Sequence, residues 1–253
     1  MGNHVTDRPA TLKQRWAIVS DVLVPALLDA PITYVGADAI LKTKNKSKKV
    51  AGNVLGSIGI TLAAKHPAGE LLEQYFHKVF GHTIDLAGID FPEKKGFGTW
   101  MAVPPELDED KIMECLTKHF KVSSYAWKTP VALNIDRAKE QRRPSSLYVF
   151  AHRGGDEPDD VHRNKSYDRA MAEGFPFANP KEYLLMTGFH RYVEGYFMDK
   201  KGWTRTSSLF SDGNMVYGHG DDDGAGLCLG CGDRDRARPD GGPRQLFLGN
   251  LSL

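Results

Sequence analysis

The stretch NPKEYLLMTGFHRYVEGYFMD, residues 179–199, carries the strongest secondary-structure signal in the chain. Asn179 is a favoured N-cap residue, Pro180 fits the first helical position, and Glu182 completes a capping box. The apolar side chains behind this start recur mostly at spacings of three and four, the period of one helical face; they are Leu185, Phe189, Tyr192, Val193 and Tyr196. The stretch predicts an amphipathic helix that ends near Asp199.

Shorter elements are predicted on both sides of this helix. Ser-initiated SYDRAMA predicts a short helix over 166–172, closed by Gly174. Apolar runs predict the neighbouring strands, which lie at 146–152, 202–208, 227–229 and 242–249. The intervening SDGNMVYGHGDDDGAG, residues 211–226, is rich in Gly and Asp and predicts turns.

The first 140 residues alternate predicted helices and strands, which is typical of a small α/β or α+β domain. Helical periodicity appears at 11–28, 67–80 and 108–120, and strand patterns appear at 52–64, 98–104 and 130–135. The charged, proline-broken stretch DRAKEQRRPSS then predicts a domain boundary. The expected fold class is therefore α+β, with domains at 1–140 and 146–253.

Composition excludes several classes of function. The formal net charge is +1, with 41% hydrophobic and 26% charged residues, which gives no general attraction to nucleic acid or to anionic membranes. The N-terminus lacks a signal-peptide pattern, and its apolar run at 22–28 is too short to cross a bilayer. We therefore expect cytoplasmic synthesis and no membrane insertion. The basic run KTKNKSKK, 42–49, has no interleaved aromatic residues, so nucleic-acid binding through it stays a minor alternative.

Five segments follow one another between about Leu147 and Leu248, namely LYVFAHRGGDEPDD, SYDRAMAEG, PKEYLLMTGFHRYVEGYFMD, TSSLFSDGN and GPRQLFLG. Through these segments the chain resembles the C-type-lectin-like variable proteins that diversity-generating retroelements target, and more distantly the formylglycine-generating-enzyme-like fold. The resemblance implies that residues 146–253 form a C-type-lectin-like domain that recognises a protein or surface ligand. It further implies that residues 1–140 attach this domain to a phage particle or bacterial assembly, and that the protein forms a homo-oligomer such as a trimer.

In that family the retroelement rewrites adenines, often in AAY codons, over a C-terminal variable region, which corresponds here to about residues 205–248. Randomising the first two bases of such a codon cannot yield Lys, Glu, Gln, Met or Trp. Between Arg205 and Gly241 there is no Lys, Glu, Gln or Trp, and Met215 is the one Met. The first four types make up 38 of the 253 residues, so about five or six would be expected in these 37. Turn chemistry explains the Gly and Asp but not the complete replacement of Lys by Arg. The bias therefore predicts a hypervariable surface.

Strand alternation predicts which residues of this region face a ligand. Leu227 and Leu229 are expected in the core, with Cys228 and Gly230 on the opposite face. The strand from Pro243 to Leu248 is expected to be scaffold. The other predicted ligand contacts are Tyr217, His219, Asp221, Asp222, Asp223, Cys231, Asp233, Arg234 and Arg236.

Catalytic and metal-binding alternatives have weaker support. His219 with Asp221–Asp223 could hold a divalent cation in a metal-dependent hydrolase, and this is the alternative function. The CLGC motif at 228–231 lacks further ligands for a structural zinc site and a helix start for redox chemistry. No GxSxG or HExxH motif occurs, the tripeptides of calcium-dependent sugar-binding lectins are absent, and His152, His162 and His190 are scattered. We therefore predict no catalytic residue, no metal site and no cofactor.

Overall fold

The computed structural model describes residues 66–140, 142, 145–221 and 226–248. The chain divides into two units, Met1–Ala64 and Lys65–Leu253, and the described residues all belong to the second. Several sequence-based predictions lie outside the described residues, namely the elements at 11–28 and 52–64, the basic run at 42–49, and the positions Asp222 and Asp223.

The described chain is mixed α+β, as predicted. Its helices are α5 (Pro67–Tyr75), the π-helix η2 (Phe76–Phe80), α6 (Glu109–Phe120), α7 (Val131–Asn134), the short 3₁₀ turns η3 (Arg137–Lys139) and η4 (Asp160–His162), α8 (Tyr167–Glu173) and α9 (Pro180–Glu194). Its strands are β1 (Thr99–Val103), β2 (Ser123–Ala126), β3 (Tyr148–His152), β4 (Trp203–Leu209), β5 (Met215–Gly220), β6 (Gly226–Gly232), β7 (Gly241–Pro243) and β8 (Leu246–Phe247).

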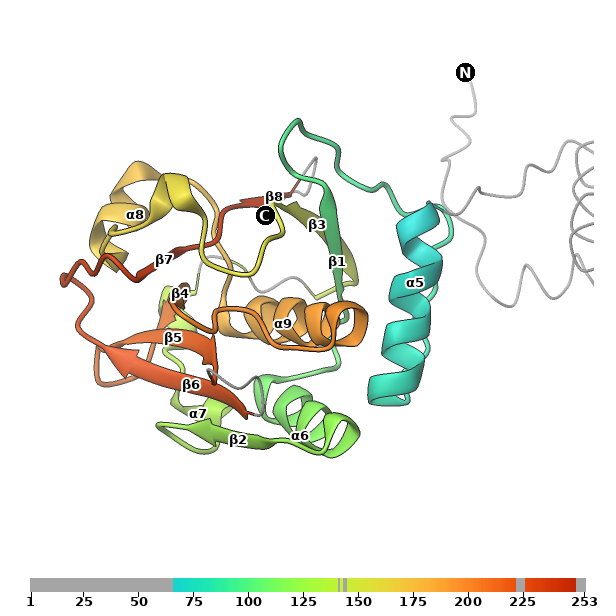
Figure 1. Ribbon diagram of the computed structural model, residues 1–253, viewed down its shortest axis with the longest axis horizontal. Helices are drawn as coiled ribbons and strands as arrows, with labels where there is room; N and C mark the ends of the chain where they lie inside the picture. The colour runs from blue at the N-terminus through green and yellow to red at the C-terminus, as the bar shows by residue number, and fades with distance from the viewer. Residues whose placement is uncertain (1–65, 141, 143–144, 222–225, 249–253) are drawn as a thin grey trace, which may run out of the picture. The chain divides into compact units, whose positions relative to one another are not determined.

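These strands form two sheets (Figure 1). A three-stranded antiparallel sheet has the order β1-β3-β8, and a five-stranded sheet has the order β2-β6-β5-β4-β7. In the larger sheet β4, β5 and β6 are antiparallel neighbours, while β2 and β7 run parallel to β6 and β4. The strand expected over 242–249 is thus two short strands, one in each sheet.

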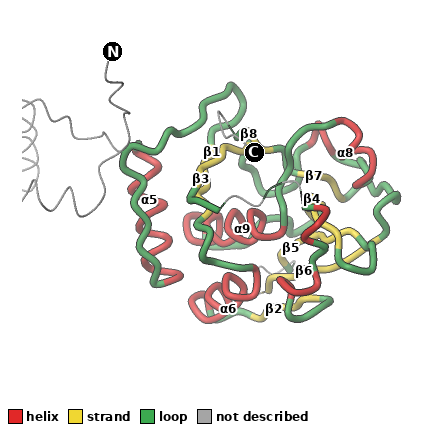
Figure 2. The backbone as a smooth tube through the Cα atoms, turned by 180° about the vertical axis from the view of Figure 1, so that it is seen from behind, coloured by secondary structure: helices red, strands yellow, loops and turns green. Residues whose placement is uncertain are grey.

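Helix α9 lies at the centre of this arrangement and contacts β1 of the small sheet, β4 and β5 of the large sheet, and helices α5 and α6 (Figures 1 and 2). Its predicted start is confirmed, because the Asn179 and Glu182 side chains form a reciprocal capping box. The helix ends at Glu194, before the expected Asp199, because Gly195 takes the left-handed conformation with φ 89°.

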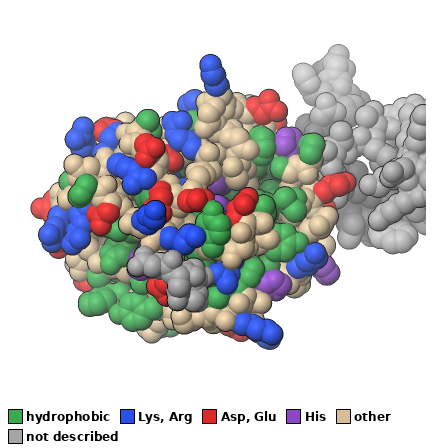
Figure 3. Space-filling view, viewed as in Figure 1, with side chains coloured by type: hydrophobic (Ala, Val, Ile, Leu, Met, Phe, Trp, Pro, Cys, Tyr) green, Lys and Arg blue, Asp and Glu red, His purple; other side chains and the backbone are tan. Residues whose placement is uncertain are grey.

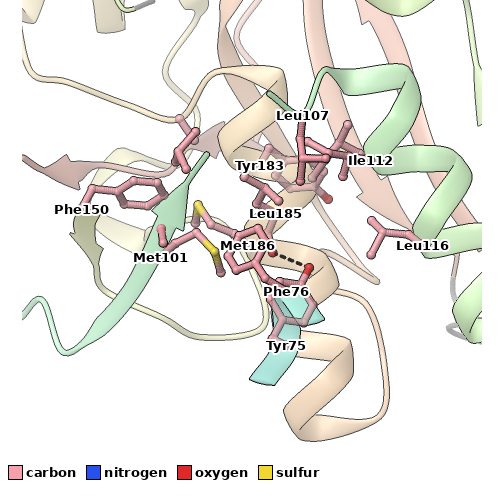
Figure 4. Packing of buried hydrophobic residues seen from close by; sticks show 14 of the residues in the cluster. Tyr75, Phe76, Met101, Leu107, Ile112, Leu116, Phe150, Tyr183, Leu185 and Met186 are labelled. Carbon is pink, nitrogen blue, oxygen red and sulfur yellow. Dashed lines mark hydrogen bonds between the residues drawn. The ribbon is translucent and has the colours of Figure 1, made fainter. Parts of the chain in front are cut away.

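One hydrophobic cluster joins both sheets and the helices between them. Figure 4 shows the part of it where α9 meets the small sheet, α5 and α6. Tyr75 of α5, Phe150 of β3 and Tyr183 of α9 are fully buried in it. The Tyr75 hydroxyl donates a hydrogen bond to the Leu185 carbonyl oxygen at 3.2 Å, so α5 is fixed to α9 by a polar contact as well as by packing. The predicted elements at 67–80, 98–104, 108–120, 146–152, 166–172 and 202–208 are all present.

The expected domain boundary in the stretch 136–146 is wrong. β1 pairs with β3 and β2 pairs with β6, so residues on both sides of this stretch share the same sheets. Two of its arginines are paired inside the fold: Arg137 contacts the buried Glu109 carboxylate at 2.7 Å, and Arg142 contacts Glu182 at 2.6 Å. A run of charges that resembles a solvated linker is therefore an internal connection.

Two further expectations differ from the structure. The segment 130–135 contains helix α7 and not a strand, because the Asp110 carboxylate accepts hydrogen bonds from the Val131 and Ala132 amides and caps a helical turn. The segment 211–226 was expected to be turns only, yet it contains strand β5.

Candidate functional site

The predicted contact residues of β5 lie on the face of the large sheet opposite α9. Tyr217 and His219 are half-buried on this open face, whereas Val216 and Gly218 are buried on the other. Gly218 is required there, since a Cβ atom at this position would overlap the Tyr183 ring of α9. Packing against α9 therefore fixes which residues of β5 face outward.

Strand β6 follows the predicted alternation at Leu227 to Gly230. Leu227 and Leu229 are buried in the main cluster, and Cys228 lies opposite His219 on the open face. Gly230 lies opposite Tyr217, and a Cβ atom there would overlap the Tyr217 ring. Gly230 is therefore buried beneath Tyr217, where it supports the aromatic ring and is not itself available to a ligand.

The two cysteines of CLGC lie on opposite faces of β6. Cys231 pairs in register with Val216 and packs against the main cluster, whereas Cys228 shares the face of His219. Both are free thiols. Burial raises the pKa of Cys228 to about 11, with the Asp221 charge acting in the same direction, and burial also raises the pKa of Cys231. Paired thiolate chemistry therefore has no support in this geometry.

A cavity of about 530 Å³ opens beside the outward-facing residues of β4 and β5. Five predicted contact residues line it, although they come from positions up to nineteen residues apart: Tyr217, His219, Cys231, Asp233 and Arg236. Of these, Cys231 also packs against the main cluster and is not an outward-facing position of β6. The lining also includes residues that were not predicted, among them Lys201, Trp203, Arg205, Arg238 and Asp240. The loop between β6 and β7 lies at the left of the view in Figure 1, and in the same view basic and acidic side chains are interspersed there as over much of the visible face (Figure 3).

An aromatic row forms one wall of the cavity. The ring centroids of Trp203 and Tyr217 are 4.9 Å apart, and His219 follows Tyr217 at 6.2 Å with nearly parallel planes. Arg205, which pairs with Tyr217 across β4 and β5, places its guanidinium carbon 4.4 Å from the Trp203 ring centroid. Rigid rings beside a cation supply both contact area and directional polar groups, a combination common in binding sites.

Arg205 is fully buried although it lines the cavity. Burial lowers its pKa to about 10, and the neighbouring positive charge of Arg238 acts in the same direction, while Asp240 opposes the shift. The side chain is therefore still cationic at neutral pH, within a site that places another positive charge close to it.

Of the other six predicted contacts, Asp222 and Asp223 lie outside the described residues, and four are not among the cavity-lining residues: Cys228 and Gly230, which lie on β6, and Arg234 and Asp221. Arg234 donates to the Asp168 carboxylate of the α8 region at 2.7 Å, so its charge is already paired. Asp221 is exposed just beyond β5. Across the described ranges, His219 and Asp221 included, no group of three or more His, Cys, Asp or Glu side chains could hold a metal ion.

Behind the cavity, a buried ion pair holds β4 and the C-terminal strands together. Arg244 contacts the Asp199 carboxylate at 2.6 Å, and the Thr204 hydroxyl donates to the same carboxylate at 2.7 Å. Arg244 also donates to the carbonyl oxygens of Gly154 and Gly155. No local sequence pattern identifies this pair, since its members lie 45 residues apart.

A second cavity of about 380 Å³ brings together two histidines that appear scattered in the sequence. His152 is buried, and burial together with the Arg244 charge lowers its pKa to about 3, so it is neutral. His190 lies 3.4 Å from the Asp156 carboxylate, which also accepts a hydrogen bond from the Tyr196 hydroxyl. Burial lowers the pKa of His190 as well, so this cavity presents neutral imidazoles at neutral pH.

Within the part of the chain that the structure describes, no helix combines the length and apolar character that spanning a membrane requires. No protein-family model, no curated protein and no solved structure matches this chain.

Proposed function

We propose that the chain is a ligand-recognition protein whose C-type-lectin-like part displays the open face of β4, β5 and β6 and the loop after β6. On this proposal a diversity-generating retroelement varies that surface while the fold beneath it stays constant. The observation that carries the proposal is the cavity itself. The composition and strand alternation of the sequence predict Tyr217, His219, Asp233 and Arg236 as ligand contacts, and these four residues line one cavity together with Trp203.

The separation of the two faces supports the same proposal. Val216, Leu227 and Leu229 face the main cluster, so substitutions at the outward positions leave the core contacts of the strands in place. Strands β3 and β8, from the two ends of the segment that carries the resemblance, pair with each other and close that segment on itself. A closed scaffold with variable outward positions is what diversified recognition requires.

The retroelement part of the proposal is tested at the level of DNA. We expect a nearby reverse-transcriptase gene and a template repeat that matches the DNA for residues 205–248 except at adenines. A genome with neither feature would rule out diversification by this route.

The recognition part is tested with two matched libraries. The first randomises the outward positions Tyr217, His219, Asp233 and Arg236, and the second randomises the inward positions, which are Val216, Gly218, Leu227 and Leu229. Most members of the outward library should express as folded protein, because exposed and half-exposed substitutions cost little stability, and most members of the inward library should not. Panning the outward library against an unrelated folded protein should yield binders. Equal loss of folding in both libraries, or no binders, would contradict the proposal.

A further inference from the structure

Three arginines are buried in the described structure, and two of them have a buried carboxylate as partner. Arg142 contacts Glu182 and Arg244 contacts Asp199, each at 2.6 Å. Arg205 is fully buried too, but no carboxylate of the described residues forms an ion pair with it. A buried charge without a counter-charge is costly, so the contrast among the three arginines requires an explanation.

The hydrogen-bonding groups of Arg205 are also incompletely used. Its Nη2 group donates to the Arg236 carbonyl oxygen. Nε and Nη1 are buried and have no acceptor among the described residues. A guanidinium carries one hydrogen on Nε and two on Nη1, so three charged N–H donors of Arg205 lack an acceptor within the described part of the chain.

The surroundings of Arg205 favour an anion. Five cationic side chains line the cavity, namely Lys200, Lys201, Arg205, Arg236 and Arg238. Two carboxylates, Asp233 and Asp240, line it as well, which leaves an excess of three positive charges. Such an excess attracts an anionic group.

The aromatic row sets the shape of the group that fits. Trp203 covers one face of the guanidinium, so an acceptor for the buried Nε and Nη1 groups has to approach in the guanidinium plane. Trp203 and Tyr217 also present apolar surface on which a short methylene chain can pack. A planar carboxylate on a methylene stem matches both the N–H edges and the apolar wall.

We infer that the cavity binds an acidic side chain, Asp or Glu, of a protein ligand, with Arg205 as the buried anchor. This inference rests on the proposed function and specifies the chemistry of the ligand at the same face. An arginine held against an aromatic ring in a desolvated pocket is the kind of residue that dominates binding energy at protein interfaces. The variable positions around it would then select among acidic ligands.

The experiment uses the full chain and a blocked peptide of alternating Glu and Ser residues, compared with the same peptide carrying Gln in place of Glu. Titration calorimetry should show that the Glu peptide binds at low salt. The Gln peptide should bind at least roughly tenfold more weakly, and a tenfold difference in Kd corresponds to about 1.4 kcal/mol. Inorganic phosphate is titrated separately. The Nε–H resonance of Arg205 in the wild-type protein, assigned by its loss in Arg205→Lys, should shift with the Glu peptide.

Two matched variants locate the effect. Arg205→Gln should weaken Glu-peptide binding at least tenfold, a factor that corresponds to about 1.4 kcal/mol. Arg234→Gln removes an arginine of the loop between β6 and β7 whose charge is paired with Asp168 and which is not among the cavity-lining residues. It should leave Glu-peptide binding within about twofold of wild type, because a surface charge contributes little. The resonance shift in the wild type provides a readout that does not depend on the folding of any variant.

The outcomes separate this inference from the proposal beneath it. Equal binding of both peptides, equal loss in Arg205→Gln and Arg234→Gln, or phosphate binding without Glu-peptide binding would overturn the carboxylate assignment. If the Glu peptide does not bind while ligands selected with the outward library still contact the open face at Tyr217 and His219, the carboxylate inference is wrong and the proposed function stands. If no binder uses that face, both fail.

Discussion

The two faces of the β4–β5–β6 sheet are built from alternate residues of the same strands, yet their chemistry differs. The inward face is continuous with the main cluster, where Val216, Leu227 and Leu229 pack and Gly218 admits the Tyr183 ring. The open face carries Tyr217, His219 and a buried cation beside a cavity. The difference shows that tolerance to substitution follows the face of the sheet and changes from one residue to the next along each strand.

The largest expected effect compares two buried arginines. Asp199→Ala should lower the free energy of unfolding by about 3–5 kcal/mol, because it leaves Arg244 buried without its carboxylate. Arg205→Gln should leave stability unchanged or raise it, since it removes a buried charge that has no carboxylate partner among the described residues. Urea denaturation of both variants measures the difference, and similar losses would contradict it.

Adjacent residues of β6 offer the next comparison. Leu229→Ala removes a fully buried side chain and should cost about 2–5 kcal/mol. Cys228→Ala, one residue earlier and on the open face, should cost less than about 1 kcal/mol. Chemical denaturation measures both losses in the free energy of unfolding, provided that the m-values stay unchanged. A loss for Cys228→Ala as large as that for Leu229→Ala would mean that the open face is packed like the core.

The next prediction concerns His152 of β3 in the small sheet, whose burial makes the free energy of unfolding depend on pH. The pKa of His152 is lowered from its ordinary 6.5 to about 3 by burial, so below pH 6.5 the unfolded chain binds a proton that the folded chain does not. This contribution is fully present above pH 6.5 and is lost as the pH falls toward 3. Between pH 7 and 5 the loss should be about 2 kcal/mol. His152→Gln should show a correspondingly flatter pH dependence in denaturation series, and an unchanged slope would contradict this account.

The smallest effect is expected at His219, at the outer end of the aromatic row. His219→Ala should change stability by no more than about 0.5 kcal/mol, because the side chain is half-exposed and its packing partner within the row is Tyr217. Its effect on ligands of the open face should be larger than its effect on folding. Comparing thermal unfolding with the affinity of outward-library binders tests this separation.

Much of the fold could be predicted because the signals were local. The capping box at Asn179 and Glu182, and the glycines that end α5–η2 and α8, act within a few residues. Strand β5 was missed because Gly218 and Gly220 occupy inward positions where an alternating pattern would need apolar side chains. Helix α7 was missed because its cap, Asp110, lies 21 residues earlier in the chain.

The candidate site could be predicted only in part for the same reason. Tyr217 and His219 were found from the composition and alternation of one segment. Trp203 and Arg205 were missed as contacts because their place in the site depends on pairing between β4 and β5, which no local pattern reveals. Arg142 was assigned to a linker because its partner, Glu182, lies 40 residues away.

The parallel pairing of β2 with β6 has a practical consequence for expressing the recognition unit. A fragment trimmed to residues 146–253 would lose β2, so the edge of β6 that pairs with β2 would expose unpaired backbone hydrogen-bonding groups. Such an edge promotes aggregation or strand exchange between copies. The same trimming would also remove α6 from its contact with α9. A fragment meant to stay monomeric should therefore keep the chain from about residue 66 onward. If a shorter fragment forms oligomers, the cause would be its exposed sheet edge and not a native oligomeric state.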